Sequence, residues 1–438
     1  MFGSARSRIE ALLRGQFLRS VAAVAGGTAA AQAIMILFSP ITTRLYGPDA
    51  FGTLGAFNAA VAVLTPVATG AYSHAIALPA KDTVAFQIAA ISLRIAFVLS
   101  IVFCLIVLFF GYPLATAVGL GPVAGYTWLL AIVFLVTGVE QVYVQWLVRR
   151  KQFRALGLIQ AVHASGVGAA NVTLGLLHPN ALTLVISTTV GRLGKTLLLV
   201  LSARDSSFTR EVADVLRSGD REARREVGGT FRDFPVFRAP QLLLNSISRN
   251  VPMLLFAGLF GTTIAGFYAI SQRALQLPLA IVSQSVGKVI LPRLAEAAQT
   301  GRPLRPLLIR STLGLAAVGF LPFAVVFTYG PFLFGLVFGP GWSNAGLYAR
   351  WLVPWLFFGF INVPIVQSLS ITKSQHFLLL WEVVATAVKV ATILAGAIVI
   401  GDVLVTIKAY SLVGAVMYLW LIVVGYRRAG IPADVRSL

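Results

Sequence analysis

Polar residues recur at helical spacing in two segments of the chain that are otherwise apolar. In the first segment, spacings of three, four and four residues place four side chains on one face of a helix: Arg238, Gln241, Asn245 and Arg249. In the next segment, Arg273 and Gln276 repeat the arrangement. A guanidinium group binds phosphate through two parallel hydrogen bonds. These faces are therefore typical of a site for an anion such as a phosphate or a pyrophosphate.

Two earlier apolar segments carry polar faces of the same kind. One contains Gln32 and ends at Arg44, and the other contains Asn58. Four such faces would line a water-filled cleft between two helix bundles. The alternative is interhelical hydrogen bonding that only holds spans together, but such contacts usually use Ser, Thr and Asn rather than Arg. We therefore expect a cationic site for substrate made of eight residues: Gln32, Arg44, Asn58, Asn245, Arg249, Arg273, Gln276 and Lys408.

The elements that position these residues are expected to be membrane-spanning helices. Of the 438 residues, 58% are apolar and only 11% are charged, whereas about a quarter of the residues in a soluble domain are charged. A span needs roughly 20 apolar residues, and twelve segments qualify: 21–43, 51–72, 86–110, 125–147, 156–177, 181–202, 238–260, 264–286, 308–330, 346–370, 377–400 and 403–425. The sequence predicts an all-α polytopic membrane protein with twelve transmembrane helices.

The basic residues between the spans indicate the orientation of the chain. They all fall in the termini and in the loops after even-numbered spans, and basic loops remain in the cytoplasm. Both termini are therefore expected there, and the net charge of +20 needs no nucleic-acid partner. The first span is expected to be retained rather than cleaved as a signal peptide.

The longest charged segment divides the spans six and six. The expected parts are a cytoplasmic basic arm (1–20), an N-lobe (21–202), a cytoplasmic linker (203–232), a C-lobe (233–425) and a cytoplasmic tail (426–438). Gly47, Gly52 and Leu78-Pro79 recur as Gly261, Gly266 and Leu291-Pro292. With six spans in each lobe, both lobes begin on the same side of the membrane. The sparse match therefore predicts a parallel repeat.

Basic residues are also unusually frequent within the spans or at their ends: Arg44, Arg94, Arg192, Lys195, Arg238, Arg249, Arg273, Arg350, Lys389 and Lys408. Only two acidic residues, Glu140 and Glu382, oppose them. Each lipid-facing cation at mid-helix would cost about 2.5–3.5 kcal/mol, so most must face protein or water. We expect Arg94, Lys195, Arg238 and Arg350 to extend to the headgroups. Glu140, Glu382 and Lys389 are expected to couple an ion to transport or to act as charge partners, and the second role is favoured.

The sequence gives little support for covalent chemistry. Cys104 is the only cysteine, and the four histidines have no metal-ligand spacing, so we expect no metal site and no cofactor. The segment Gly191–Thr196 ends like a phosphate-binding loop, but Thr189 stands where that motif needs its first glycine. A transporter is therefore favoured over an enzyme.

The segment Ser39–Pro48, with the sequence SPITTRLYGP, is followed by Ala50-Phe51-Gly52 and Ala75–Pro79. In these motifs the chain resembles the Wzx-type oligosaccharide flippases of the multidrug/oligosaccharidyl-lipid/polysaccharide exporter superfamily. The resemblance implies two six-helix lobes around a V-shaped central cleft that opens alternately to each side. It also implies that the cleft is lined by the first two spans of each lobe.

The resemblance further implies a protein of the bacterial inner membrane. The implied substrate is an undecaprenyl-pyrophosphate-linked repeat unit of O-antigen (lipopolysaccharide), capsule or exopolysaccharide, moved to the periplasmic leaflet. Membrane lipids and other membrane proteins of polysaccharide assembly are the partners that it implies. Two alternatives remain open at this point: a multidrug or small-solute antiporter of the same superfamily, and a membrane glycosyltransferase or polymerase.

Overall fold

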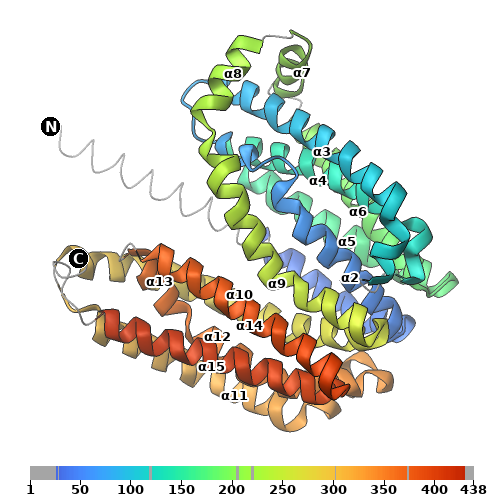
Figure 1. The fold of residues 1–438 in the computed structure, drawn as a ribbon, viewed down its shortest axis with the longest axis vertical. Coiled ribbons are helices and arrows are strands. Elements are labelled where there is room, and N and C mark those ends of the chain that lie inside the picture. Colours follow the sequence, from blue (N-terminus) through green and yellow to red (C-terminus); the bar gives the residue numbers. More distant parts are fainter. Residues whose placement is uncertain are drawn as a thin grey trace. The chain divides into compact units, whose positions relative to one another are not determined.

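The computed structural model contains helices and no strands in the residues that it describes, which are 26–27, 29–117, 121–203, 207–218, 221–300, 302–371 and 374–429 (Figure 1). The basic arm (1–20) and most of the tail lie outside these residues. The described residues confirm the all-α class.

The helices of the first half begin with Ala29–Leu45. After it come α2 (Pro48–Leu64), α3 (Asp82–Ala117), α4 (Trp128–Arg149), α5 (Phe153–Leu177), α6 (Ala181–Ser202), α7 (Phe208–Ser218) and α8 (Arg221–Thr230). The second half contains α9 (Ala239–Phe260), α10 (Thr262–Gln299), α11 (Leu304–Phe338), α12 (Ser343–Ile361), α13 (Val363–Ile371), α14 (Gln375–Ala395) and α15 (Val403–Ala429). Short 3-10 or π-helical turns join several of them, among them η1 (Thr65–Val67), η2 (Tyr72–Ala75) and η5 (Phe234–Arg238).

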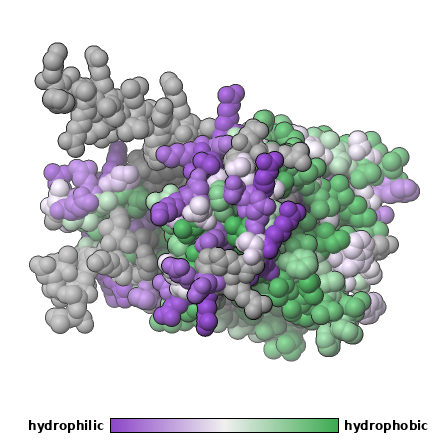
Figure 2. All heavy atoms as spheres, turned by 90° about the horizontal axis from the view of Figure 1, so that it is seen from above, coloured by the Kyte–Doolittle hydropathy of each residue, from purple (hydrophilic) through white to green (hydrophobic). Residues whose placement is uncertain are grey.

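Helices occupy the positions of the expected spans, although the first span is described only in part. Among the described helices, eight are long and apolar enough to cross a membrane, and α12 with α13, which meet at a 42° bend, would make a ninth. The helices at the other three expected positions are Ala29–Leu45, which is short, and α5 and α10. Figure 2 shows an apolar surface over much of one face, with hydrophilic side chains gathered apart from it. These helices make a polytopic membrane protein.

The chain divides into two compact units that exchange short segments. Unit 1 comprises residues 1–46 and 57–250, and unit 2 comprises residues 47–56 and 251–438. Helices α2 and α9 therefore contribute residues to both units. The lobe boundaries expected from the sequence, and the V-shaped cleft, stay predictions.

The segment expected to link the lobes is folded onto unit 1. Its helix α7 packs on α3, and Phe208 of α7 is fully buried and stacks on Trp146 of α4, with 4.2 Å between ring centroids. The hydroxyl of Tyr72 donates to the carbonyl oxygen of Gly228 in α8 at 3.0 Å. The many charged residues of this segment indicated a cytoplasmic linker. In the structure, the apolar face of α7 packs the segment against α3 and α4.

Arg94 of α3 takes part in this docking. Its guanidinium donates to the carbonyl oxygen of Leu216 at 2.7 Å, near the end of α7. A cation at a helix C-terminus also interacts favourably with the helix dipole. The charge of Arg94 thus has a protein partner that the sequence did not indicate, and its position relative to the headgroups stays a prediction.

Gln141 of α4 stabilises the break that follows α2. Here the backbone of Gly70 and Ala71 has positive φ, at 56° and 58°, and the helix ends in two 3-10 turns. The Gln141 amide donates to the carbonyl oxygen of Thr65 at 2.7 Å, and its oxygen accepts from the Thr69 hydroxyl at 2.8 Å. These bonds satisfy groups that a continuous helix would have paired. The second-half counterpart, α10, continues without a break.

Within unit 2, the first turns of α2 and α10 cross through the repeated glycines. A Cβ atom at Gly52 would overlap the carbonyl oxygen of Thr262, and a Cβ atom at Gly266 would overlap that of Pro48. Pro48 and Gly52 correspond to Thr262 and Gly266 in the repeat, so the contact is reciprocal. Reciprocal contacts are what an approximate two-fold axis between equivalent segments produces, and they support the sparse sequence match.

The close crossing of α2 and α10 predicts that alanine substitutions at Gly52 and at Gly47 have different effects on stability. Gly52→Ala should lower the thermal unfolding midpoint of the purified protein, because the backbones must separate and overpacking costs about 1–3 kcal/mol. Gly47→Ala is the matched control, since a Cβ atom there meets nothing within 4 Å. Equal midpoints for the two variants, measured by intrinsic fluorescence in detergent, would show that the crossing is looser than described.

Candidate functional site

Unit 1 contains five of the eight residues expected to bind substrate: Gln32, Arg44, Asn58, Asn245 and Arg249. Unit 2 contains Arg273, Gln276 and Lys408. The five residues of unit 1 and the three residues of unit 2 are therefore described separately.

The polar face of α9 forms largely as its spacing predicts. Arg238 ends the π-helical turn η5 just before α9 and donates to the Gln241 side-chain oxygen at 3.0 Å. Farther along, Asn245 is half-buried and Arg249 is exposed. No acidic side chain of the described residues forms an ion pair with Arg249. The guanidinium of Arg249 is therefore available to an anionic ligand.

The adjacent face of α9 explains why Arg249 is presented in this way. The hydroxyl of Ser246 donates to the carbonyl oxygen of Ala62 in α2 at 2.6 Å, and the Asn250 amide donates to the Ser246 carbonyl oxygen at 2.8 Å. The first of these contacts joins α9 to α2, and the second lies within α9. Arg249, three residues after Ser246, borders this packing face, and its side chain is exposed.

A histidine lies within the influence of the positive charge of Arg238. His74 lies in η2, and its pKa is lowered by burial and then by the positive charge of Arg238. Its imidazole is therefore neutral near pH 7, so Arg238 is the charged group of the pair.

The polar residues of α10 form a chain of hydrogen bonds in unit 2. The Gln276 amide donates to the Gln272 oxygen at 3.3 Å, and the Gln272 amide in turn donates to the Tyr268 hydroxyl. Gln276 is exposed at the end of this chain. Arg273 is half-buried beside it and forms no ion pair with the described acidic residues. The sequence identified Gln276 and Arg273, whereas Gln272 and Tyr268 emerge only from the folded arrangement.

Glu140 is paired with a cation. Its carboxylate accepts from the Lys195 ammonium at 2.6 Å, and both side chains are less than one-fifth exposed. Lys195 was expected to extend to the headgroups, and that expectation was wrong, because an acid from α4 lies within its reach. In this structure Glu140 acts as a charge partner.

Two further lysines lie over indole rings. Lys389 of α14 lies 5.5 Å from the ring centroid of Trp355, and Lys408 of α15 lies 4.5 Å from that of Trp351. Both tryptophans belong to α12. Glu382 precedes Lys389 by two helical turns on α14, and its backbone carbonyl accepts the Thr386 hydroxyl at 2.6 Å. Cation–π contacts between helices leave no periodic signal in a sequence, so this arrangement was not expected.

No group of three or more His, Cys, Asp or Glu side chains in the described part of the chain could hold a metal ion. Cys104 is exposed on α3. The polar faces of α9 and α10 offer a ligand basic and amide side chains. They can bind an anion and hydrogen-bond to hydroxyl groups.

Comparisons with known proteins give the family and the fold of the chain. A family model described as "Polysaccharide biosynthesis protein" matches residues 41–346. A search of curated proteins found no match.

Solved structures share the fold at low sequence identity. An inward-facing multidrug resistance MATE family transporter of the MOP superfamily has a TM-score of 0.72 at 14% identity, with 93% of this chain and 95% of that chain covered. A MOP superfamily transporter from Pyrococcus furiosus has a TM-score of 0.60 at 12% identity, with 96% of each chain covered. A eukaryotic MATE transporter has a TM-score of 0.56 at 15% identity, with 94% and 98% covered.

The family match extends over well over half of the chain, and the structural matches extend over nearly all of it. The chain therefore belongs to the polysaccharide biosynthesis protein family and has the fold of the MOP superfamily transporters.

Proposed function

We propose that the protein is a flippase for lipid-linked oligosaccharides. It moves undecaprenyl-pyrophosphate-linked repeat units of O-antigen, capsule or exopolysaccharide from the cytoplasmic to the periplasmic leaflet of the bacterial inner membrane. Other membrane proteins of polysaccharide assembly supply and consume this substrate. The observation that carries the proposal is a transporter fold in a polysaccharide biosynthesis family, in which Arg249 and Arg273 form no ion pair with the acidic residues that the structure describes.

The residues of the polar faces have distinct roles in this proposal. Arg249 and Arg273, helped by Arg44, bind the pyrophosphate through charge-assisted hydrogen bonds. The amides of Gln32, Asn58, Asn245 and Gln276 donate to and accept from the glycan hydroxyl groups. The undecaprenyl chain stays in the bilayer, because moving this apolar chain into water would be unfavourable.

The charge distribution supports an anionic substrate. Glu140 is neutralised by Lys195, while Arg249 and Arg273 have no ion pair among the described residues. A cation without a partner in an apolar helix costs several kcal/mol. Binding a pyrophosphate offsets this cost, and a neutral or cationic drug does not.

The same pairing weighs against a drug antiporter. A coupling carboxylate must be able to bind and release its ion, and the Glu140 carboxylate is held by Lys195 at 2.6 Å. A glycosyltransferase or polymerase is disfavoured by the small number of acidic groups, because glycosyl transfer usually uses carboxylates. Transport of a lipid-linked oligosaccharide is thus the function that these observations favour.

The pyrophosphate assignment predicts that Arg249→Ala and Arg273→Ala severely reduce glycan export at normal membrane abundance. Loss of one charged hydrogen-bond donor to a phosphate costs roughly 1.5–3 kcal/mol, or about 10- to 100-fold in affinity. Lys should rescue incompletely, because it lacks the bidentate geometry of Arg. Export is measured as surface polysaccharide on cells that depend on the variant.

Arg154→Ala is the control for this experiment. Arg154 is an exposed arginine at the start of α5, so its removal tests for a general effect of lost charge, and export should stay normal. Normal export by the Arg249→Ala/Arg273→Ala double variant would contradict the assignment of the pyrophosphate site.

The proposed orientation places α7 in the cytoplasm and the start of α12 in the periplasm. Ser218 ends α7 and Asn344 lies in the first turn of α12, and both are exposed. In a Cys104→Ser background, an impermeant thiol reagent added to intact cells with a permeable outer membrane should modify Asn344→Cys and not Ser218→Cys. The reverse pattern would overturn the orientation.

A further inference from the structure

Helix α12 carries two tryptophans one turn apart, and each lies beneath a lysine from another helix. Trp355 pairs with Lys389 of α14, and Trp351 pairs with Lys408 of α15. The first pair is buried, since Trp355 and Lys389 are each 9% exposed. Trp351 and Lys408 are only half-buried. The two pairs have the same chemistry, but only the second is open to a ligand.

The second pair lies on an apolar face of unit 2. On α15, Lys408 falls three residues after Val405 and four before Leu412, which are 40% and 64% exposed, so the three side chains share a helix face. On the other side of the pair, Trp351 packs edge-on against Phe327 of α11, with 6.1 Å between ring centroids. Exposed aliphatic and aromatic side chains on membrane-spanning helices are typical of a lipid-facing surface.

The position of Lys408 along α15 agrees with contact to headgroups. It lies five residues after Val403, where the helix begins, which is about 7.5 Å at 1.5 Å per residue. A lysine at this depth reaches the polar region of the bilayer with its side chain. Tryptophan is enriched at the same level of membrane proteins.

A second cation, Arg350 of α12, is held against the same turn of α11 as Trp351, because it contacts Thr328 while Trp351 contacts Phe327. Arg350 precedes Trp351, and its guanidinium donates to the carbonyl oxygen of Thr328 in α11 at 2.8 Å. Its Nε atom is buried without a hydrogen-bond partner. Neither Arg350 nor Lys408 forms an ion pair with an acidic residue in the described ranges. Around Trp351, α15 thus supplies Lys408 over the indole ring, and α12 supplies Arg350 at the neighbouring contact with α11.

We propose that Lys408, Trp351 and Arg350 bind the headgroup of an anionic phospholipid. The phosphodiester lies against the two cations, and the acyl chains lie along Phe327 and Leu412. The negative charge of the lipid complements positive charge that no protein group neutralises. This site gives Lys408 a role apart from the pyrophosphate site, and it does not depend on the proposed function.

The test is the affinity of the delipidated full-length protein in detergent for short-chain phosphatidylglycerol, with phosphatidylcholine as the zwitterionic reference. Each basic residue near a membrane surface contributes roughly 1 kcal/mol to the binding of anionic lipid, which is about fivefold in affinity. Lys408→Met and Arg350→Gln should each weaken phosphatidylglycerol binding by about this factor. Trp351→Leu should also weaken it.

Two controls separate the site from general charge effects. Lys389→Met removes the buried lysine of the matching pair, and Arg154→Met removes an exposed cation elsewhere, so both should keep the affinity of the unaltered protein. Unchanged binding in both Lys408→Met and Arg350→Gln would overturn the proposal, as would an equal loss in Lys389→Met. Inorganic phosphate should not compete at millimolar concentration, and competition by it would show a free-phosphate site instead of a lipid site.

Discussion

The imbalance between basic and acidic residues within apolar helices is the constraint on which the rest of the structure depends. Basic residues in or beside the spans far outnumber Glu140 and Glu382, and an unpaired cation in a bilayer is expensive. The fold meets this constraint in several ways. Lys195 takes the carboxylate of Glu140, Lys389 and Lys408 lie over indole rings, and Arg94 binds a carbonyl oxygen at the end of α7.

Arg249 and Arg273 remain without such an arrangement in the described part of the chain. Both lie in helices whose neighbouring faces are fixed by packing: Ser246 joins α9 to α2, and Ser271 joins α10 to α12 through the carbonyl oxygen of Ala345 at 2.6 Å. The two guanidinium groups are therefore held on well-positioned helices without a protein counter-ion. A transported anion is the counter-ion that the proposed function supplies.

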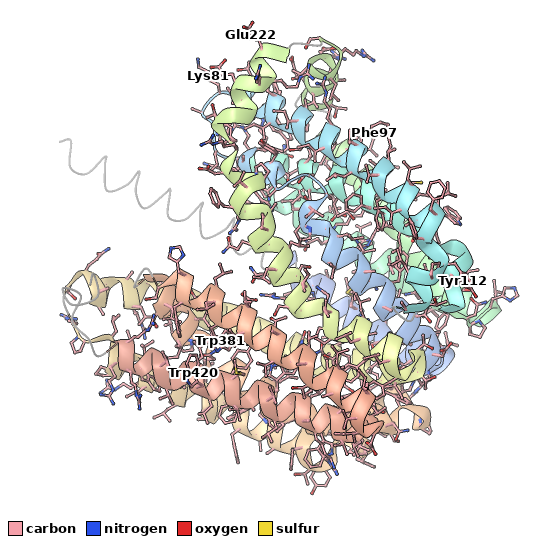
Figure 3. The ribbon with its side chains drawn as sticks, in the orientation of Figure 1. Lys81, Phe97, Tyr112, Glu222, Trp381 and Trp420 are labelled. Carbon is pink, nitrogen blue, oxygen red and sulfur yellow. The ribbon has the colours of Figure 1, made fainter. Side chains whose placement is uncertain are left out.

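Periodic features of the fold could be predicted from the sequence. Apolar length gave the spans, residue spacing gave the polar faces of α9 and α10, and the recurrence of Gly52 as Gly266 indicated the repeat whose members meet in unit 2. Each of these features depends on the spacing of residues within one segment or on the close approach of two backbones. Figure 3 shows two side chains of α3, Phe97 and Tyr112, which are exposed on the surface of this long apolar helix.

Contacts between distant residues could not be predicted in this way. The docking of Phe208 on Trp146, the bonds from Gln141 to the break after α2, and the lysines over Trp351 and Trp355 all join helices far apart in the chain. Trp381 of α14, which is labelled in Figure 3, makes another contact of this type. Its ring centroid lies 5.3 Å from that of Tyr418 in α15. A single sequence gives the face on which such a residue lies but not its partner. Arg94 and Lys195 were expected to extend to the headgroups because the sequence does not show their partners, which are the carbonyl oxygen of Leu216 and the carboxylate of Glu140.

The most direct test of the proposed function is transbilayer movement of a lipid-linked oligosaccharide in proteoliposomes that contain only this protein. A fluorescent undecaprenyl-pyrophosphate oligosaccharide is placed in both leaflets, and a membrane-impermeant quencher then reports which leaflet it occupies over time. We expect the protected half of the fluorescence to become accessible faster as the protein density rises, and an undecaprenol without pyrophosphate to compete poorly. The same slow exchange in proteoliposomes and in protein-free vesicles, under an imposed proton or sodium gradient of either direction, would contradict the flippase function.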